Sequence, residues 1–238
     1  MRRHRVYMPD LQPGRHALPA AEADHLRRVL RSKPGDAVTL FDGAGGEADA
    51  VVEALSREGV RVAVGQIVSR PFECLIRVTL ATALPRGPRQ STLIEKCTEL
   101  GVWAIWPLVC ERSVVRAGDG SVAKWQRTVI EACKQCGRAW ATRVERPRPF
   151  DEVIATAGEF DLVMMADVCE EAVAIADLTE GRPPPRSALM LIGPEGGWSA
   201  GETEVAGRIG AITVRLGPHV MRIETAAIAA IALLIGGR

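Results

Sequence analysis

The sequence has no apolar run long enough to cross a bilayer. Its longest apolar stretch, Ala226 to Ile235, is far shorter than the roughly 20 residues that a membrane-spanning helix needs. No leading basic segment is followed by an apolar run and a small-residue cleavage site, so we expect no signal peptide. These absences predict a cytoplasmic protein with no membrane partner.

Cysteine and histidine are also scarce, with six and four residues respectively. Cys133 and Cys136 form a Cys-x-x-Cys pair, but a structural zinc site needs four ligands, and no second pair with suitable spacing is present. We therefore predict no metal and assign both thiols to helix packing. Three of the four histidines lie before residue 26, so the sequence gives no basis for a Ser–His–Asp triad.

The net charge of +1 hides an uneven distribution along the chain. Residues 1–31 hold seven basic against three acidic side chains, residues 85–148 hold twelve against six, and residues 149–238 hold six against thirteen. Two basic blocks in a near-neutral protein suggest a localised surface for a polyanion. Chance unevenness on solvated surfaces is the alternative.

Residues 1–71 are typical of a small β-barrel domain with one helix. The helix is expected over Ala20–Arg31, with Leu26, Val29 and Leu30 facing inward. Short strands are predicted at Arg5–Met8, Ala37–Phe41, Ala48–Ala54 and Val60–Val68. We place the domain boundary at Pro71, which gives domains 1–71 and 72–238.

From about residue 75 onward, strands alternate with helices. This pattern predicts an α/β domain in which a parallel sheet carries helices on both faces. Strands are expected at Ile76–Ala83, Val102–Leu108, Leu162–Ala166, Ala188–Ile192 and Ile212–Leu216. Helices are expected at Gln90–Leu100, Val122–Cys136, Ala200–Ile209 and Thr225–Ile235. Ligands of such sheets bind beyond the carboxyl ends of the strands. A stiff connector is expected at Arg182–Arg186.

Two strand ends carry glycine-rich turns. The first, Gly193–Gly197, precedes a helix for which Ser199 and Glu202 predict a capping box. It lacks the lysine of a phosphate-binding loop and does not match Gly-x-Gly-x-x-Gly. By itself, such a turn is either structural or a place where a ligand approaches the backbone.

The second turn, Leu216–Met221, leads through Arg222 and Glu224 into an alanine-rich helix. Small side chains allow close helix packing, either in a core or at an interface.

These motifs together resemble the SPOUT superfamily of knotted methyltransferases. Within it they are similar to the uridine-N3 methyltransferases of bacterial small-subunit (16S) ribosomal RNA. The resemblance covers nearly the whole chain, and its motifs occur in the family's order. They are His25–Arg31, Glu95–Val102, Glu111–Ser113, Glu131–Arg138, Leu191–Gly197, Leu216–Pro218 and Arg222–Ala227.

The resemblance implies a PUA-like N-terminal domain, a C-terminal trefoil knot, a homodimer and S-adenosylmethionine as methyl donor. Mainly backbone groups would surround the donor. The residues expected there are Ala166, Leu191, Gly193, Pro194, Gly196, Gly197, Leu216, Gly217, Met221, Thr225 and Ala226. Two positions depart from the family, because His219 stands where many members have arginine, and Ile223 where threonine is commoner.

The chemistry of uridine N3 suggests roles for Arg222 and Glu224. Methylation requires removal of the N3 proton, which spreads negative charge over O2 and O4. Arg222 could stabilise that charge but cannot accept the proton; its alternative role is holding a surface carboxylate. Glu224 is the carboxylate to consider as base, although the start of a helix lowers its basicity. Binding backbone N–H groups is its alternative.

The basic residues predict contacts with RNA phosphates. His25, Arg28 and Arg31 are spaced three apart and would share one side of the N-terminal helix, near Arg2, Arg3 and Arg5. Further contacts are expected from Arg86, Arg89, Arg112 and Arg138. A solvated helix face is the alternative for each arginine.

The expected partner is ribosomal RNA or the small ribosomal subunit, and two other functions stay open at this point. Ribose 2′-O-methyltransferases of the same superfamily usually carry a Ser-Leu-Asn type sequence where this chain has Arg222–Thr225. A non-catalytic RNA-binding assembly factor would keep the fold without the chemistry, but the intact glycines argue against it.

Overall fold

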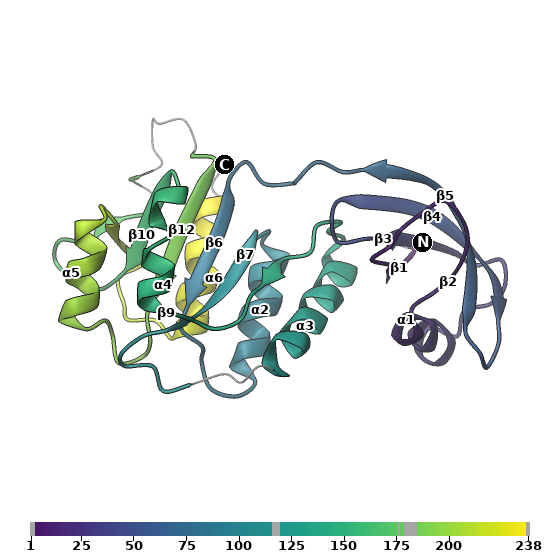
Figure 1. Ribbon diagram of the computed structural model, residues 1–238, viewed down its shortest axis with the longest axis horizontal. Helices are drawn as coiled ribbons and strands as arrows, with labels where there is room; N and C mark the ends of the chain where they lie inside the picture. The colour runs from purple at the N-terminus through teal and green to yellow at the C-terminus, as the bar shows by residue number, and fades with distance from the viewer. Residues whose placement is uncertain (1–2, 116–119, 176, 179–184, 237–238) are drawn as a thin grey trace. The chain divides into compact units, whose positions relative to one another are not determined.

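The computed structural model describes residues 3–115, 120–175, 177–178 and 185–236. They form two compact units (Figure 1). The first comprises residues 1–73 together with 130–141, and the second comprises residues 74–129 and 142–238. Arg2 and residues 182–184 of the expected connector lie outside the described residues.

The first unit is built on a five-stranded sheet with the order β1-β3-β4-β5-β2. β1 pairs with β3 in parallel, and the other pairs are antiparallel. The strands are β1 (His4–Tyr7), β2 (Gly14–Ala17), β3 (Ala37–Phe41), β4 (Gly46–Leu55) and β5 (Val60–Ser69). Alternate residues of β4, namely Ala48, Ala50 and Val52, are buried in the core of this unit, as expected for a sheet with one solvated face.

The helix of the first unit differs from the prediction. Only α1 (Ala20–Asp24) is α-helical, and His25–Val29 continues it as a π-helix, in which Leu30 N–H donates to the His25 carbonyl. The wider turn changes which side chains face inward. Leu26 is fully buried, but Val29 is 65% exposed, so its predicted inward orientation is wrong.

The second unit contains an eight-stranded sheet whose path runs β11-β13-β10-β12-β6-β7-β8, with β9 also pairing with β7. Every described pair is parallel. The strands are β6 (Arg77–Thr82), β7 (Ala104–Val109), β8 (Arg143–Val144), β9 (Arg148–Pro149), β10 (Leu162–Ala166), β11 (Val173–Ala174), β12 (Ser187–Ile192) and β13 (Ile212–Arg215). The five long strands confirm the predicted parallel sheet.

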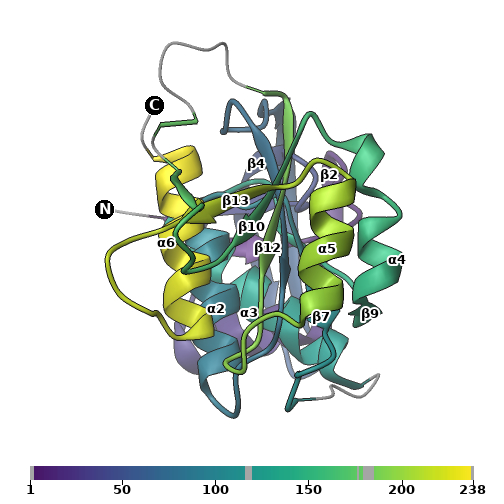
Figure 2. The ribbon, with the colours of Figure 1, turned by 90° about the vertical axis from the view of Figure 1, so that its left-hand side faces the viewer.

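Helices cover both faces of this sheet. Figure 2 shows α2 and α6 on one face and α4 and α5 on the other. The helices of this unit are α2 (Arg89–Glu99), α4 (Phe150–Ile154), α5 (Ala200–Arg208) and α6 (Ile223–Ile235), with a 3₁₀ turn at Ala157–Glu159. α3 (Gly120–Cys136) begins in this unit, and its residues from Ile130 onward belong to the first unit. The α/β class is confirmed. The trefoil knot stays a prediction.

Candidate active site

Three neighbouring strands of the second unit end at one edge of the sheet. β10 lies between β12 and β13 and runs parallel to both, so the loops that follow these strands converge. They enclose one cavity. Its lining consists of Ala166, Asp167, Val168, Ile192, Gly193, Pro194, Glu195, Gly197, Trp198, Leu216, Gly217, His219, Val220, Met221, Ile223 and Ala226.

Trp198 fixes the inner wall of the cavity. The residue is 8% exposed, and its ring centroid lies 5.7 Å from that of Phe150. Its Nε1–H donates to the carbonyl of Ala166, the last residue of β10, at 2.9 Å. A Cβ added at Gly193 would lie 2.8 Å from the Trp198 ring, so Gly193 is required by packing. Trp198 was not among the residues predicted from sequence, although a tryptophan beside a glycine-rich turn is a signal that could have indicated it.

The predicted capping box at the start of α5 is confirmed. Ser199 N–H donates to Glu202 Oε2 at 2.8 Å, and Glu202 N–H donates to Ser199 Oγ at 3.3 Å. Glu202 Oε1 also accepts the N–H of Glu111 at 3.0 Å. Because Glu202 is only 8% exposed, its carboxylate links the turn after β7 to the loop that lines the cavity.

Gly197 has a left-handed backbone, with φ of +72°. A Cβ built on it would meet no atom within 4 Å. The glycine is therefore required by its backbone conformation, and it leaves open space at the cavity lining.

Eight of the eleven predicted donor-binding residues line this cavity. The other three do not. Leu191 is fully buried inside β12, and Thr225 is exposed in the first turn of α6. Gly196 lies against Arg112, because a Cβ there would be 3.3 Å from Arg112 Cβ. His219, for which the sequence predicts no definite role, is an exposed residue of the lining.

Arg222 and Glu224 occupy the start of α6. Arg222 is the exposed N-cap residue, and Glu224 lies in the first turn with a side chain 11% exposed. Glu224 Oε1 is 3.6 Å from Arg89 Nη1. Its Oε2 is buried without a hydrogen-bond partner among the described residues. The carboxylate thus faces an arginine, in place of the backbone N–H groups considered as the alternative.

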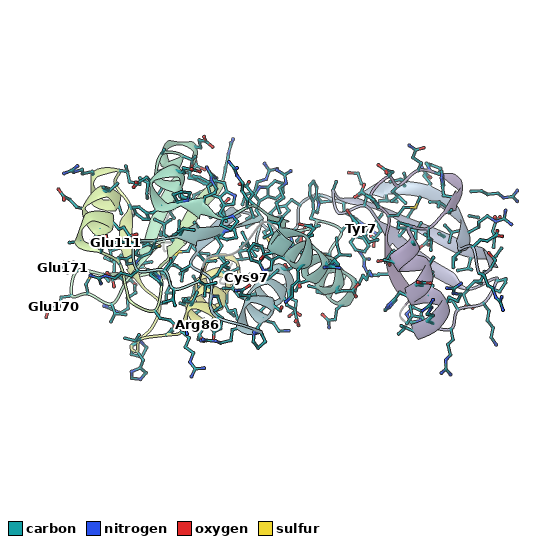
Figure 3. All side chains as sticks on the ribbon, turned by 60° about the horizontal axis from the view of Figure 1, so that its bottom comes forward. Tyr7, Arg86, Cys97, Glu111, Glu170 and Glu171 are labelled. Atoms are coloured by element: carbon teal, nitrogen blue, oxygen red, sulfur yellow. The ribbon has the colours of Figure 1, made fainter. Side chains whose placement is uncertain are left out.

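The predicted RNA-contacting arginines of the second unit have different surroundings. Arg86, labelled in Figure 3, is exposed. Arg112 Nη1–H donates to the Gly196 carbonyl at 3.0 Å. Arg89 Nη1–H donates to Glu195 Oε1 at 3.1 Å in addition to its contact with Glu224. Arg112 and Arg89 therefore contact the loops around the cavity.

In the first unit, two of the arginines predicted to contact RNA have partners within the protein. Arg138 is 8% exposed and bonded to Glu73. Arg5 is bonded to Glu47 and to the Arg138 carbonyl and lies over Phe41. Burial opposes ionisation of Glu47, but hydrogen bonds from Arg5 and Arg70 outweigh it and lower the pKa of Glu47. These partners favour a structural role for both arginines over RNA contact.

The remaining predicted residues of the first unit are accessible. Arg28 has a side chain 71% exposed, with Nε 3.7 Å from Asp24. Arg31 is exposed, with a left-handed φ of +52°, and His25 is half-buried. A cleft of this unit is lined by Arg3, His4, Arg5, His25, Leu30, Glu131, Lys134 and Gln135. The π-helix thus places one predicted RNA contact, His25, in a basic cleft.

Within the described parts of the chain, no three His, Cys, Asp or Glu side chains gather as a metal site. Cys133 and Cys136 are free thiols in α3. Of the helices whose residues are described, none has the length and apolar character needed to cross a membrane.

Comparison with known proteins places this site in a family. Residues 73–235 match the model of an RNA methyltransferase domain, and residues 18–64 match that of an RNA methyltransferase PUA domain. "Ribosomal RNA small subunit methyltransferase E" of Synechocystis is 32% identical over 216 residues, which cover 90% of this chain and 71% of the relative. The chain belongs to the ribosomal RNA small subunit methyltransferase E family. The family predicted from the motifs is confirmed.

Solved structures show the same fold. A methyltransferase from Legionella pneumophila, with bound SAM, aligns with a TM-score of 0.89 at 32% identity, covering 98% of this chain and 97% of the other. The family member from Neisseria gonorrhoeae, bound to S-adenosyl methionine, aligns with a TM-score of 0.87 at 31% identity, covering 97% and 96%. The PUA-like unit and the α/β methyltransferase domain are therefore those of the family.

Proposed function

We propose that this protein transfers a methyl group from S-adenosylmethionine to N3 of a uridine in small-subunit ribosomal RNA. The observation that carries the proposal is the cavity at the carboxyl ends of β10, β12 and β13. Family relatives with this fold have been solved with S-adenosylmethionine bound. Family membership supports small-subunit ribosomal RNA as the substrate.

The lining of the cavity fits a methyl donor of this kind. Side chains such as Ile192, Leu216 and Met221 offer apolar walls. Backbone groups of the three loops are available for the donor's polar atoms, and Gly197 leaves space beside them. When bound, the donor supplies an electrophilic methyl group.

Arg222 and Glu224 are the proposed groups for the acceptor base. Arg222 is exposed at the N-cap of α6, where its guanidinium can approach O2 or O4 of a uracil and stabilise the anion that forms at N3. Glu224 is the proposed acceptor for the N3 proton, since this carboxylate lies two residues after Arg222 and its Oε2 has no hydrogen-bond partner among the described residues.

RNA affinity is assigned to the exposed basic residues. Arg28 and Arg31 in the first unit, and Arg86 in the second, present charge to solvent, and the half-buried His25 lines the cleft of the first unit. Their proposed partners are phosphates, which fix the position of the RNA without specifying its sequence.

A homodimer, a knotted C-terminus and a cytoplasmic location are also part of the proposal. α6 is apolar along almost its whole length, yet Leu233 is 41% exposed. A second copy covering this helix would bury that surface. Ala229→Trp should then give monomers in sedimentation velocity, because a large ring would prevent close packing.

Mass spectrometry of ribosomal RNA nucleosides after incubation with donor and purified protein tests the function. We expect 3-methyluridine, with donor uptake in calorimetry. A ribose-methylated product would indicate the 2′-O class, and no donor uptake would indicate a non-catalytic factor.

Arg222→Ala should bind donor normally and lose turnover, because its charge acts on the uracil anion. Normal turnover in that variant would refute the role of Arg222.

A further inference from the structure

Arg89 connects two walls of the donor cavity. It is the first residue of α2, and its Nη1 lies 3.1 Å from Glu195 Oε1 and 3.6 Å from Glu224 Oε1. Glu195 belongs to the loop after β12, and Glu224 to the first turn of α6. Glu195 lines the cavity, as does Ile223, the neighbour of Glu224.

The two ion pairs differ in burial. The Glu195 side chain is 46% exposed, whereas the Glu224 side chain is 11% exposed. An exposed pair contributes little, because water screens it. A nearly buried carboxylate that loses its cation is costly, because its charge is then uncompensated. Glu224 Oε2 already has no hydrogen-bond partner among the described residues, so Arg89 is the cation that the structure gives to this carboxylate.

We infer that Arg89 is a positioning residue that holds the Pro194–Glu195 loop and the start of α6 together around the donor, and not an RNA contact. This inference rests on the proposed function of the same cavity. Arginine suits the role because a single planar guanidinium presents several N–H groups to carboxylates that come from different elements. A lysine has one point charge on a flexible stem and would hold the pair less rigidly.

The two roles of Arg89 predict different measurements. A positioning residue changes affinity for the donor, whereas a phosphate contact changes affinity for RNA and its salt dependence. Arg89→Met keeps the apolar length of the side chain and removes the charge. Arg86→Met is the matched reference, since Arg86 lies in the same segment and is exposed.

The experiment measures S-adenosylmethionine affinity by calorimetry and RNA affinity at several salt concentrations for both variants. We expect Arg89→Met to weaken donor binding by at least about tenfold, because the nearly buried charge of Glu224 loses its compensating partner, with the RNA salt slope unchanged. Arg86→Met should show the reverse pattern. Donor affinity within about twofold of the wild type, with a shallower RNA salt slope, would overturn the inference.

Two further variants give the test a second arm. Glu224→Gln removes the charge that Arg89 compensates, so the double variant Arg89→Met, Glu224→Gln should bind donor better than Arg89→Met alone. Arg89→Lys should fall between wild type and Arg89→Met, and it is less disruptive to folding. Equal donor affinity in Arg89→Lys and wild type, together with additive effects in the double variant, would contradict the coupling. A wild-type protein without donor uptake would instead refute the proposed function.

Discussion

Glu202 is the side chain whose replacement should most directly test the construction of the cavity. Its two carboxylate oxygens accept from the N–H groups of Ser199 and Glu111 at 2.8 and 3.0 Å. In Glu202→Gln, one carbonyl oxygen remains for two donors, and the other N–H faces an amide NH₂. The shape of the side chain is kept, so the variant isolates the hydrogen bonds.

The expected loss follows from burial. Hydrogen bonds to charged groups contribute roughly 1.5–3 kcal/mol, and removing a helix cap costs about 1 kcal/mol. Since one of the two bonds can be retained, we expect the free energy of unfolding to fall by about 2 kcal/mol. For a chain of this size that corresponds to a Tm lower by roughly 4–8 °C.

Glu204→Gln is the matched control on the same helix. Glu204 is 65% exposed and pairs with Arg208 one turn later at 2.5 Å, so its replacement should cost less than about 0.5 kcal/mol. Urea unfolding followed by tryptophan fluorescence is suitable, because the tryptophans of the second unit are Trp103, Trp106, Trp125 and Trp198. Equal losses in the two variants would refute the stabilising role assigned to Glu202.

Three other predictions concern the thiols, the cavity and the N-terminal unit. Burial raises the pKa of three thiols to about 12, so they should resist Ellman's reagent at pH 8 until unfolding; they are Cys97, Cys110 and Cys133. The folded state holds these thiol protons more tightly than the unfolded chain does. The contribution of the thiols to the free energy of unfolding should therefore be constant below about pH 9 and be lost as pH rises toward 12. Urea unfolding at pH 8 and 10 would detect this loss. Gly197→Val should weaken donor binding in calorimetry, both by strain at φ +72° and by filling open space; normal affinity would sink the assignment. Replacing Arg28 and Arg31 by Ala should weaken RNA binding and flatten its salt dependence in filter-binding titrations, and an unchanged slope would mean a solvated surface.

The long elements of the fold were predictable from sequence, and the short ones were not. β3 and β10 have the predicted bounds, and the ends of the other long strands and helices are close to them. Their apolar residues recur often enough to reveal a period. The two-residue strands β8, β9 and β11 are too short to show a periodic pattern of apolar residues. They form because a neighbouring strand offers hydrogen-bonding groups.

The N-terminal helix shows a different limit. Leu26, Val29 and Leu30 fit an α-helical face, but the π-helix at His25–Val29 places Val29 in solvent. A π-helix is set by tertiary packing against its surroundings, and its hydrogen bonds leave no mark on the sequence pattern. The burial of Arg138 is likewise set by tertiary packing. Its place in a basic block of the sequence suggested RNA contact, but the side chain is buried beside Glu73.

At the candidate site, the sequence predicted the position of the cavity better than it predicted which charged side chains meet there. Glycine and proline mark the ends of β12 and β13 because the chain must turn sharply there, and the turns enclose the donor cavity. Which charged side chains meet at that cavity depends on how distant loops approach each other. Arg89 contacts Glu195 and Glu224 only because α2 begins beside α6, and nothing in the spacing of these residues along the chain indicates that contact.

The turns of the cavity and the charged residues beside it should tolerate substitution differently. A cavity enclosed by glycine- and proline-containing turns can keep its shape while some of its side chains change, provided that the turns are retained. His219 and Ile223, the two positions where the resemblance predicts a departure from the family, both line the cavity without altering its glycines. Arg89 and Glu224 instead depend on each other, because removing Arg89 leaves the nearly buried Glu224 carboxylate without its cation. We therefore expect single replacements at His219 to alter donor affinity less than single replacements at Arg89, although His219 lines the cavity and Arg89 does not.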